Sequence, residues 1–129
     1  MIDTGALRPA SAQSLRTYYE GGPNGEMVSP LSILDPNIVW TLPGRTPVSG
    51  VWKGPDQVRA MFEISNQTFW MVHSKVIRTV TGPDDAITVN DSIFKYRQSQ
   101  RFIRVSVLHH FKFGPDPIFD PINQLLMYF

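Results

Sequence analysis

Two adjacent histidines lie in the middle of an apolar stretch near the C-terminal end of the sequence, VLHHFKF, residues 107–113. The alternation of residue types predicts a β-strand, and neighbouring side chains on a strand point to opposite faces. His109 then shares a face with Phe111, whereas His110 lies with Lys112. A histidine on an apolar face needs a hydrogen-bond partner, and burial keeps it neutral. His109 is therefore a general acid/base, a ligand contact or a core residue.

An aspartate lies among β-branched residues on the preceding predicted strand, residues 86–98. If the turn after this strand centres on Ser99, Asp91 is the diagonal neighbour of His109 on one face, roughly 7–8 Å away. The two could then form an acid/base pair, directly or through one water. A turn centred between Ser99 and Gln100 breaks this geometry, because a slip of one residue moves a side chain to the other face. A bulge could likewise turn Asp91 outward.

The other polar residues give weaker evidence for a functional site. Tyr18 and Tyr19 lie on a predicted helix, and the one that faces the sheet could donate a hydrogen bond to a ligand oxygen or within the core. The histidines at 73, 109 and 110 lack the spacing of a metal site, so we expect no metal and no cofactor. The sequence also has no glycine-rich phosphate loop after a strand and no serine nucleophile motif.

Composition limits the classes of function. The chain has 129 residues, which suits one domain, and its 12 basic and 11 acidic residues give a net charge of +1. This balance argues against nucleic-acid or membrane partners. There is no cysteine, no signal peptide and no apolar run of transmembrane length, so we expect a cytoplasmic protein.

The pattern of elements predicts an α+β domain of residues 11–129 after a flexible arm, residues 1–10. Three helices come first: one that begins with Ser11 as its N-cap and stops at GGPNG, a short one with Met27, Leu31 and Leu34, and one that begins near Pro55. Between the last two lie a turn at Asp35-Pro36-Asn37, a short strand, IVWTLPG, and a glycine-bracketed connector, residues 50–54. Four long strands follow, predicted at residues 71–81, 86–98, 101–113 and 117–129. The apolar end of the last one favours a homodimer.

The order of four segments, DPNIVWTLPG, a GxWKG connector, PDQVRAMF and VLHHFKFGPDPI, resembles the SnoaL-like and ketosteroid-isomerase-like branch of the nuclear transport factor two superfamily. The resemblance covers roughly residues 15–129. It implies a cone-shaped fold, in which helices pack on a strongly curved, mostly antiparallel sheet around a deep apolar pocket. Many members of this family are homodimers.

The resemblance also implies roles for single residues. The family's oxyanion-hole tyrosine falls on Tyr18, and its second hydrogen-bond donor, a protonated aspartate in the isomerases, falls on His109. The catalytic base of the isomerases falls on Leu42, which has no carboxylate, so steroid double-bond isomerisation is not expected. SnoaL-like cyclases, and related dehydratases, have their acid/base groups on the long strands, where His109 and Asp91 lie.

Two hypotheses follow. The first is an isomerase, cyclase or dehydratase that acts on a small apolar carbonyl compound or a polycyclic metabolite, with His109, Asp91 and Tyr18 as catalytic residues. The second is a non-catalytic ligand-binding or dimerisation domain of the same fold. In either case we expect the ligand to be bound by apolar and aromatic side chains: Trp40, Leu42, Trp52, Phe62, Val107, Phe111 and Phe129.

Overall fold

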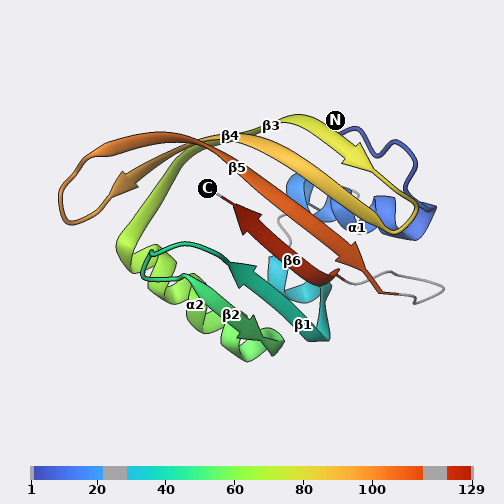
Figure 1. The fold of residues 1–129 in the computed structure, drawn as a ribbon, viewed down its shortest axis with the longest axis horizontal. Coiled ribbons are helices and arrows are strands. Elements are labelled where there is room, and N and C mark those ends of the chain that lie inside the picture. Colours follow the sequence, from blue (N-terminus) through green and yellow to red (C-terminus); the bar gives the residue numbers. More distant parts are fainter. Residues whose placement is uncertain (1, 22–28, 115–121, 129) are drawn as a thin grey trace.

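The computed structural model describes residues 2–21, 29–114 and 122–128. Two α-helices, one 3-10 helix and six strands follow one another along the chain (Figure 1). In chain order they are α1 (Pro9–Glu20), η1 (Pro30–Ile33), β1 (Leu34–Leu42), β2 (Gly50–Lys53), α2 (Gly54–Thr68), β3 (Phe69–Thr81), β4 (Asp85–Tyr96), β5 (Phe102–Phe113) and β6 (Ile122–Tyr128).

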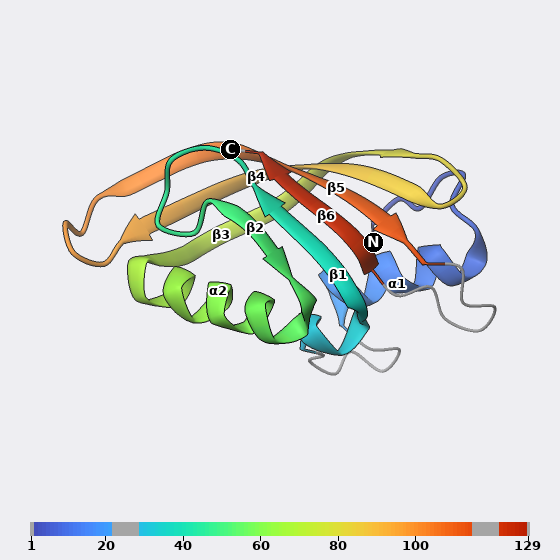
Figure 2. The ribbon, with the colours of Figure 1, turned by 60° about the horizontal axis from the view of Figure 1, so that its bottom comes forward.

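The six strands form one sheet in the order β2-β1-β6-β5-β4-β3. All neighbouring pairs are antiparallel except β1 and β6, which run parallel. The sheet arches over both α-helices, which lie on the same side of it (Figure 2). The predicted α+β class and the mostly antiparallel, curved sheet are thus confirmed.

The prediction of three helices was wrong for the described residues, which hold two α-helices. The second predicted helix is the 3-10 helix η1, where Ser29 caps the backbone N–H of Leu31. Leu34, assigned to that helix, opens β1 instead, and Met27 lies outside the described residues. A proline in such a short segment leaves too few backbone hydrogen bonds for a full α-helix.

The first helix begins earlier than predicted. Pro9 occupies its first turn and the N-cap is Arg8, so Ser11 lies inside the helix and is buried. A proline at the first helical position is favourable because the N–H it lacks has no intrahelical partner there. The helix ends as predicted at Gly21, whose φ of 84° lies in the left-handed region.

Two segments predicted as turn and connector belong to the sheet. Asp35-Pro36-Asn37 lies within β1, where a register shift between Leu34 and Val39 accommodates it. Residues 50–53 form β2, which pairs with β1 so that Trp52 lies opposite Trp40. The glycines at both ends of this segment obscured the strand signal.

The core fills the space between the sheet and the helices. Its largest fully buried apolar side chains come from β1, β5, β6 and both helices: Trp40, Phe111, Leu15, Ile38, Leu42, Ile122, Leu125, Val58 and Val107. In α2, Val58 and Met61 are three residues apart, so they lie on one face of the helix, and both are buried.

The strand β3 forms one edge of the sheet and is mostly exposed. Its pairing with β4 is interrupted twice, between Met71 and His73 and between Val76 and Arg78.

Candidate functional site

His109 lies on the inner face of β5, as the alternation predicted. Its side chain is 8% exposed, and Val107 and Phe111 on the same face are also buried. Its Nδ1 atom is 2.7 Å from the Tyr19 hydroxyl oxygen, within hydrogen-bond distance. Burial lowers the pKa of His109 from 6.5 to about 4, so the imidazole is neutral at neutral pH.

The tyrosine that bonds to His109 is Tyr19, whereas the sequence pointed to Tyr18. Tyr19 also lies 2.6 Å from the hydroxyl of Thr88, so its phenol bridges β4 and β5. Tyr18 packs edge-on against Phe111, with ring centroids 5.1 Å apart, and its hydroxyl has no hydrogen bond with any described residue. Burial raises the pKa of both phenols, so both stay protonated.

The inner face of β4 carries a buried polar row that the sequence interpretation missed. Thr88, Asn90 and Ser92 are each at most 2% exposed. The Asn90 amide nitrogen donates to the Val107 carbonyl oxygen and to the Thr88 hydroxyl, both at 3.1 Å. The Asn90 side-chain oxygen is buried and has no partner among the described residues. Three polar residues at alternate positions were the available signal.

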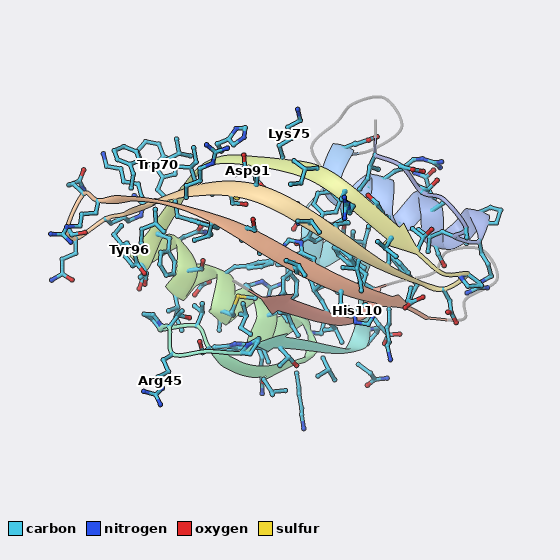
Figure 3. The ribbon with its side chains drawn as sticks, turned by 45° about the horizontal axis from the view of Figure 1, so that its top comes forward. Arg45, Trp70, Lys75, Asp91, Tyr96 and His110 are labelled. Atoms are coloured by element: carbon cyan, nitrogen blue, oxygen red, sulfur yellow. The ribbon has the colours of Figure 1, made fainter. Side chains whose placement is uncertain are left out.

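The predicted pairing of Asp91 with His109 is wrong. In the register of the β4–β5 hairpin Thr88 lies opposite His109, and Asp91 lies opposite Ser106 with its side chain on the outer face. Figure 3 shows Asp91 on the same side of the sheet as Lys75. There Asp91 forms an ion pair with Arg104 at 2.8 Å. Hydrogen bonding by that guanidinium lowers the pKa of Asp91.

The reason for this error is the hairpin turn. Tyr96 bonds to the carbonyl oxygen of Arg101, so the turn centres between Gln98 and Ser99, half a residue before the assumed centre. Gln100 adopts a left-handed φ of 59° to close it. The shift exchanges the two faces of β4 relative to His109.

The remaining histidines lie away from this cluster. His110 points to the outer face, where its Nε2 atom is 3.3 Å from Asp85. His73 is exposed on the edge strand. Among the described residues no group of three or more potential ligand side chains could hold a metal ion.

A cavity of about 600 Å³ lies between the sheet and the helices, next to His109. None of the described side chains that line it carries a formal charge at neutral pH. The lining residues are Tyr18, Tyr19, Trp40, Leu42, Thr46, Val48, Met61, Phe62, Ser65, Asn66, Phe69, Met71, Ser74, Val76, Asn90, Ser92, Phe94, Tyr96, Ile103, Val105, Val107 and His109.

The cavity opens toward the β4–β5 hairpin. On the sheet, the wall beside His109 is buried, whereas at the hairpin end Met71 is 57% and Ile103 38% exposed. On β5 the lining residues run from Ile103 to His109, which at about 3.3 Å per residue is roughly 20 Å. The cavity is thus elongated, with the cluster around His109 at the end away from the hairpin.

Four of the predicted ligand contacts line this cavity: Trp40, Leu42, Phe62 and Val107. Trp52 does not line it; its indole N–H donates to the carbonyl oxygen of Val48, which does. Phe111 lies in the core beneath the tyrosines rather than at the cavity surface. Phe129 lies outside the described residues.

No protein-family model matches the chain, and no curated protein matches it either. Solved structures match its fold over most of its length. One neighbour is a Mesorhizobium loti protein assigned provisionally to the SnoaL-like polyketide cyclases; it is 9% identical, with a TM-score of 0.70 over 93% of this chain and 96% of its own. An NTF2-like protein from Burkholderia thailandensis is 19% identical, with a TM-score of 0.69 over 91% and 85%. This chain has the NTF2-like fold.

A third structure extends the comparison to the isomerase branch. A Catenulispora acidiphila protein with a ketosteroid-isomerase-like fold, in complex with trimethylamine, is 10% identical, with a TM-score of 0.66 over 94% of this chain and 85% of its own. The resemblance inferred from the sequence is therefore confirmed at the level of the fold.

Within the described residues no helix has the length and apolar character needed to span a bilayer.

Proposed function

We propose that this NTF2-like protein binds a small, neutral, largely apolar molecule in the 600 Å³ cavity and holds an oxygen atom of that molecule at the His109 end. The observation that carries the proposal is the hydrogen-bonded group of His109, Tyr19 and Thr88, buried in the wall of a cavity that has no charged lining residue. Cavities of this size with a few convergent polar groups are typical small-molecule sites.

The lining favours a neutral ligand. A charged group moved from water into this cavity would lose hydration without gaining a counter-charge from the described residues, which is costly. The elongated shape and the aromatic walls fit a planar or polycyclic skeleton.

Two atoms are available to bond the ligand oxygen. The Nε2 atom of His109 has no hydrogen bond with a described residue, and it is not among the fully buried atoms that lack one, so it keeps accessible surface. The same holds for the Tyr18 hydroxyl. Both side chains line the cavity. A hydrogen bond from either one would polarise a carbonyl and stabilise the negative charge that develops there in isomerisation, cyclisation or dehydration.

A second candidate is ligand binding without chemistry, and one observation favours it. Leu42 lines the cavity where the resembling isomerases have their base, and no described lining residue is a carboxylate. A catalysed reaction would therefore need a substrate whose C–H bond is already acidic, or His109 itself as the base.

The test is binding of neutral, acidic and basic polycyclic compounds, measured by isothermal titration calorimetry. We expect neutral carbonyl compounds to bind, and His109→Gln to weaken them by roughly ten-fold, the equivalent of one hydrogen bond. His110→Gln on the outer face is the matched control and should bind like the wild type. Exclusive binding of charged compounds, or equal affinities for both variants, would contradict the proposal.

Turnover separates the two candidates. If the protein is an enzyme, His109→Ala abolishes turnover of the substrate while the fold survives; unchanged turnover would remove His109 from the mechanism.

We propose in addition that the chain is a homodimer, which light scattering after size-exclusion chromatography measures directly.

A further inference from the structure

In each hydrogen bond around His109 one group donates the proton and the other accepts it, and Asn90 determines which group donates. We infer that Asn90 is a positioning residue: through Thr88 and Tyr19 it makes His109 carry its proton on Nε2, so that the cavity presents a donor to the ligand and selects a hydrogen-bond acceptor, such as a ketone or quinone oxygen. The choice of ligand group rests on the function proposed above. The proton arrangement does not.

The orientation of the Asn90 amide is the starting point. One of its two terminal atoms lies 3.1 Å from the Val107 carbonyl oxygen, which can only accept a hydrogen bond. That atom must be the nitrogen, since an oxygen there would face another acceptor. The other hydrogen of this nitrogen points to the Thr88 hydroxyl oxygen, also at 3.1 Å.

The next two bonds follow from this one. The Thr88 hydroxyl accepts from Asn90, and its remaining neighbour among the described residues is the Tyr19 hydroxyl at 2.6 Å, to which it donates its single proton. Tyr19 then accepts from Thr88 and donates its own proton to Nδ1 of His109 at 2.7 Å. A neutral imidazole that accepts at Nδ1 carries its hydrogen on Nε2.

The opposite direction leaves a buried group unsatisfied. If Nδ1 of His109 donated to Tyr19, and Tyr19 to Thr88, the Thr88 proton would have no acceptor among the described residues, although Thr88 is fully buried. If Tyr19 instead accepted from both His109 and Thr88, its own phenol proton would have no acceptor among the described residues. An unmade hydrogen bond in such a place disfavours the arrangement by a factor on the order of ten.

This direction restricts the ligand group. The accessible Nε2–H of His109 and the Tyr18 hydroxyl both offer protons, so a carbonyl oxygen can accept from one or both. An alcohol can accept as well, but its own proton then needs an acceptor at the same end of the cavity. The Asn90 side-chain oxygen has almost no accessible surface, and the Tyr18 hydroxyl oxygen can accept the alcohol proton only if its own proton turns away from the ligand, where no described residue accepts it. A ketone should therefore bind better than the alcohol of the same skeleton.

The decisive experiment is long-range ¹H–¹⁵N correlation NMR of the ligand-free protein with ¹⁵N-labelled histidine. The spectrum separates protonated from unprotonated ring nitrogens, and His73→Gln and His110→Gln identify the signals of His109. We expect the wild-type protein to show His109 with a protonated Nε2 and a bare Nδ1. A protonated Nδ1 would overturn the inference, and no ligand enters this measurement.

Asn90→Asp reverses the predicted direction, because a carboxyl group can accept from Thr88, which frees Tyr19 to donate to Thr88 and His109 to donate to Tyr19. The His109 proton should move to Nδ1. Asn66→Asp is the matched control, since Asn66 also lines the cavity but is exposed and outside this chain of bonds. If Asn90→Asp does not fold, Asn90→Ser serves, because its hydroxyl can either donate to Thr88 or accept from it, and there we expect a mixture of both tautomers. An unchanged His109 tautomer in a folded Asn90→Asp protein would contradict the positioning role.

The ligand preference is measured with 9-fluorenone and 9-fluorenol, two neutral probes of one skeleton. The wild-type protein should bind the ketone several-fold more tightly, and Asn90→Asp should lose or invert this preference. Tighter binding of the alcohol by the wild type would overturn the acceptor preference. Failure of either probe to bind would count against the proposed function and leave the tautomer result standing.

Discussion

Removal of the Tyr19 hydroxyl is the most direct test of the site's geometry. Tyr19→Phe deletes two hydrogen bonds in one step, those with Nδ1 of His109 at 2.7 Å and with the Thr88 hydroxyl at 2.6 Å. Each polar group left unsatisfied in a buried place costs about 1–2 kcal/mol, so we expect a loss of about 2–4 kcal/mol in the free energy of unfolding. Tyr18→Phe, the adjacent residue on α1, loses no hydrogen bond with a described residue and should cost less than about 1 kcal/mol.

The assay is urea unfolding of both variants without ligand, supported by thermal unfolding. For 129 residues the unfolding entropy gives roughly 4 °C per kcal/mol, so Tyr19→Phe should lower Tm by roughly 7–15 °C. The slope of the urea transition should match that of the wild type, because the same surface becomes exposed. If Tyr18→Phe is as destabilising as Tyr19→Phe, or more so, the assignment of Tyr19 as the partner of His109 is refuted.

Three further outcomes are expected. The folded-state pKa of His109, about 4, lies below its unfolded value of 6.5, so the unfolded state binds more protons between these values and stability falls as the pH drops through this window, by up to roughly 3 kcal/mol. Urea titrations near pH 7 and pH 4.5 should show this acid sensitivity reduced in His109→Gln but retained in His110→Gln. Asp91→Asn should leave the dissociation constant of a cavity ligand unchanged within about two-fold, since its side chain lies on the outer face; a ten-fold loss would contradict the register. Gly5→Ala should lower the free energy of unfolding by about 1–3 kcal/mol in urea, because Gly5 has a φ of 45° and a Cβ there would collide with Thr81; full stability would refute that contact.

The sequence was sufficient for β5 because every inward side chain of that strand except His109 is apolar. The side chain of His109 points inward together with those of Phe111 and Val107, and the alternation of residue types along the strand predicts this. The same rule failed on β4, whose inner face carries buried polar residues. There the polar residues Thr88 and Asn90 point inward, and the β-branched residues alternating with them point outward.

Two other errors have separate origins, one in the rotation of a helix and one in the geometry of a turn. Successive residues on a helix are about 100° apart, so the sequence could not tell which of Tyr18 and Tyr19 meets the sheet until the rotation of α1 is known. The turn after β4 contains no glycine, and Gln100 supplies the left-handed residue instead, which left its position open by half a residue. This shift of half a residue puts the Asp91 side chain on the outer face, away from His109.

The two interruptions in the pairing of β3 affect whether another chain can add a strand at this edge of the sheet. An exposed edge strand offers unpaired backbone groups that can recruit a second strand and start aggregation. Bulges break the regular spacing that such a partner needs, and Lys75 and Arg78 place like charges along the same edge. The opposite edge, β2, is four residues long. Both borders of the sheet thus resist strand addition, so copies of this chain should associate through faces of the sheet rather than by extending it.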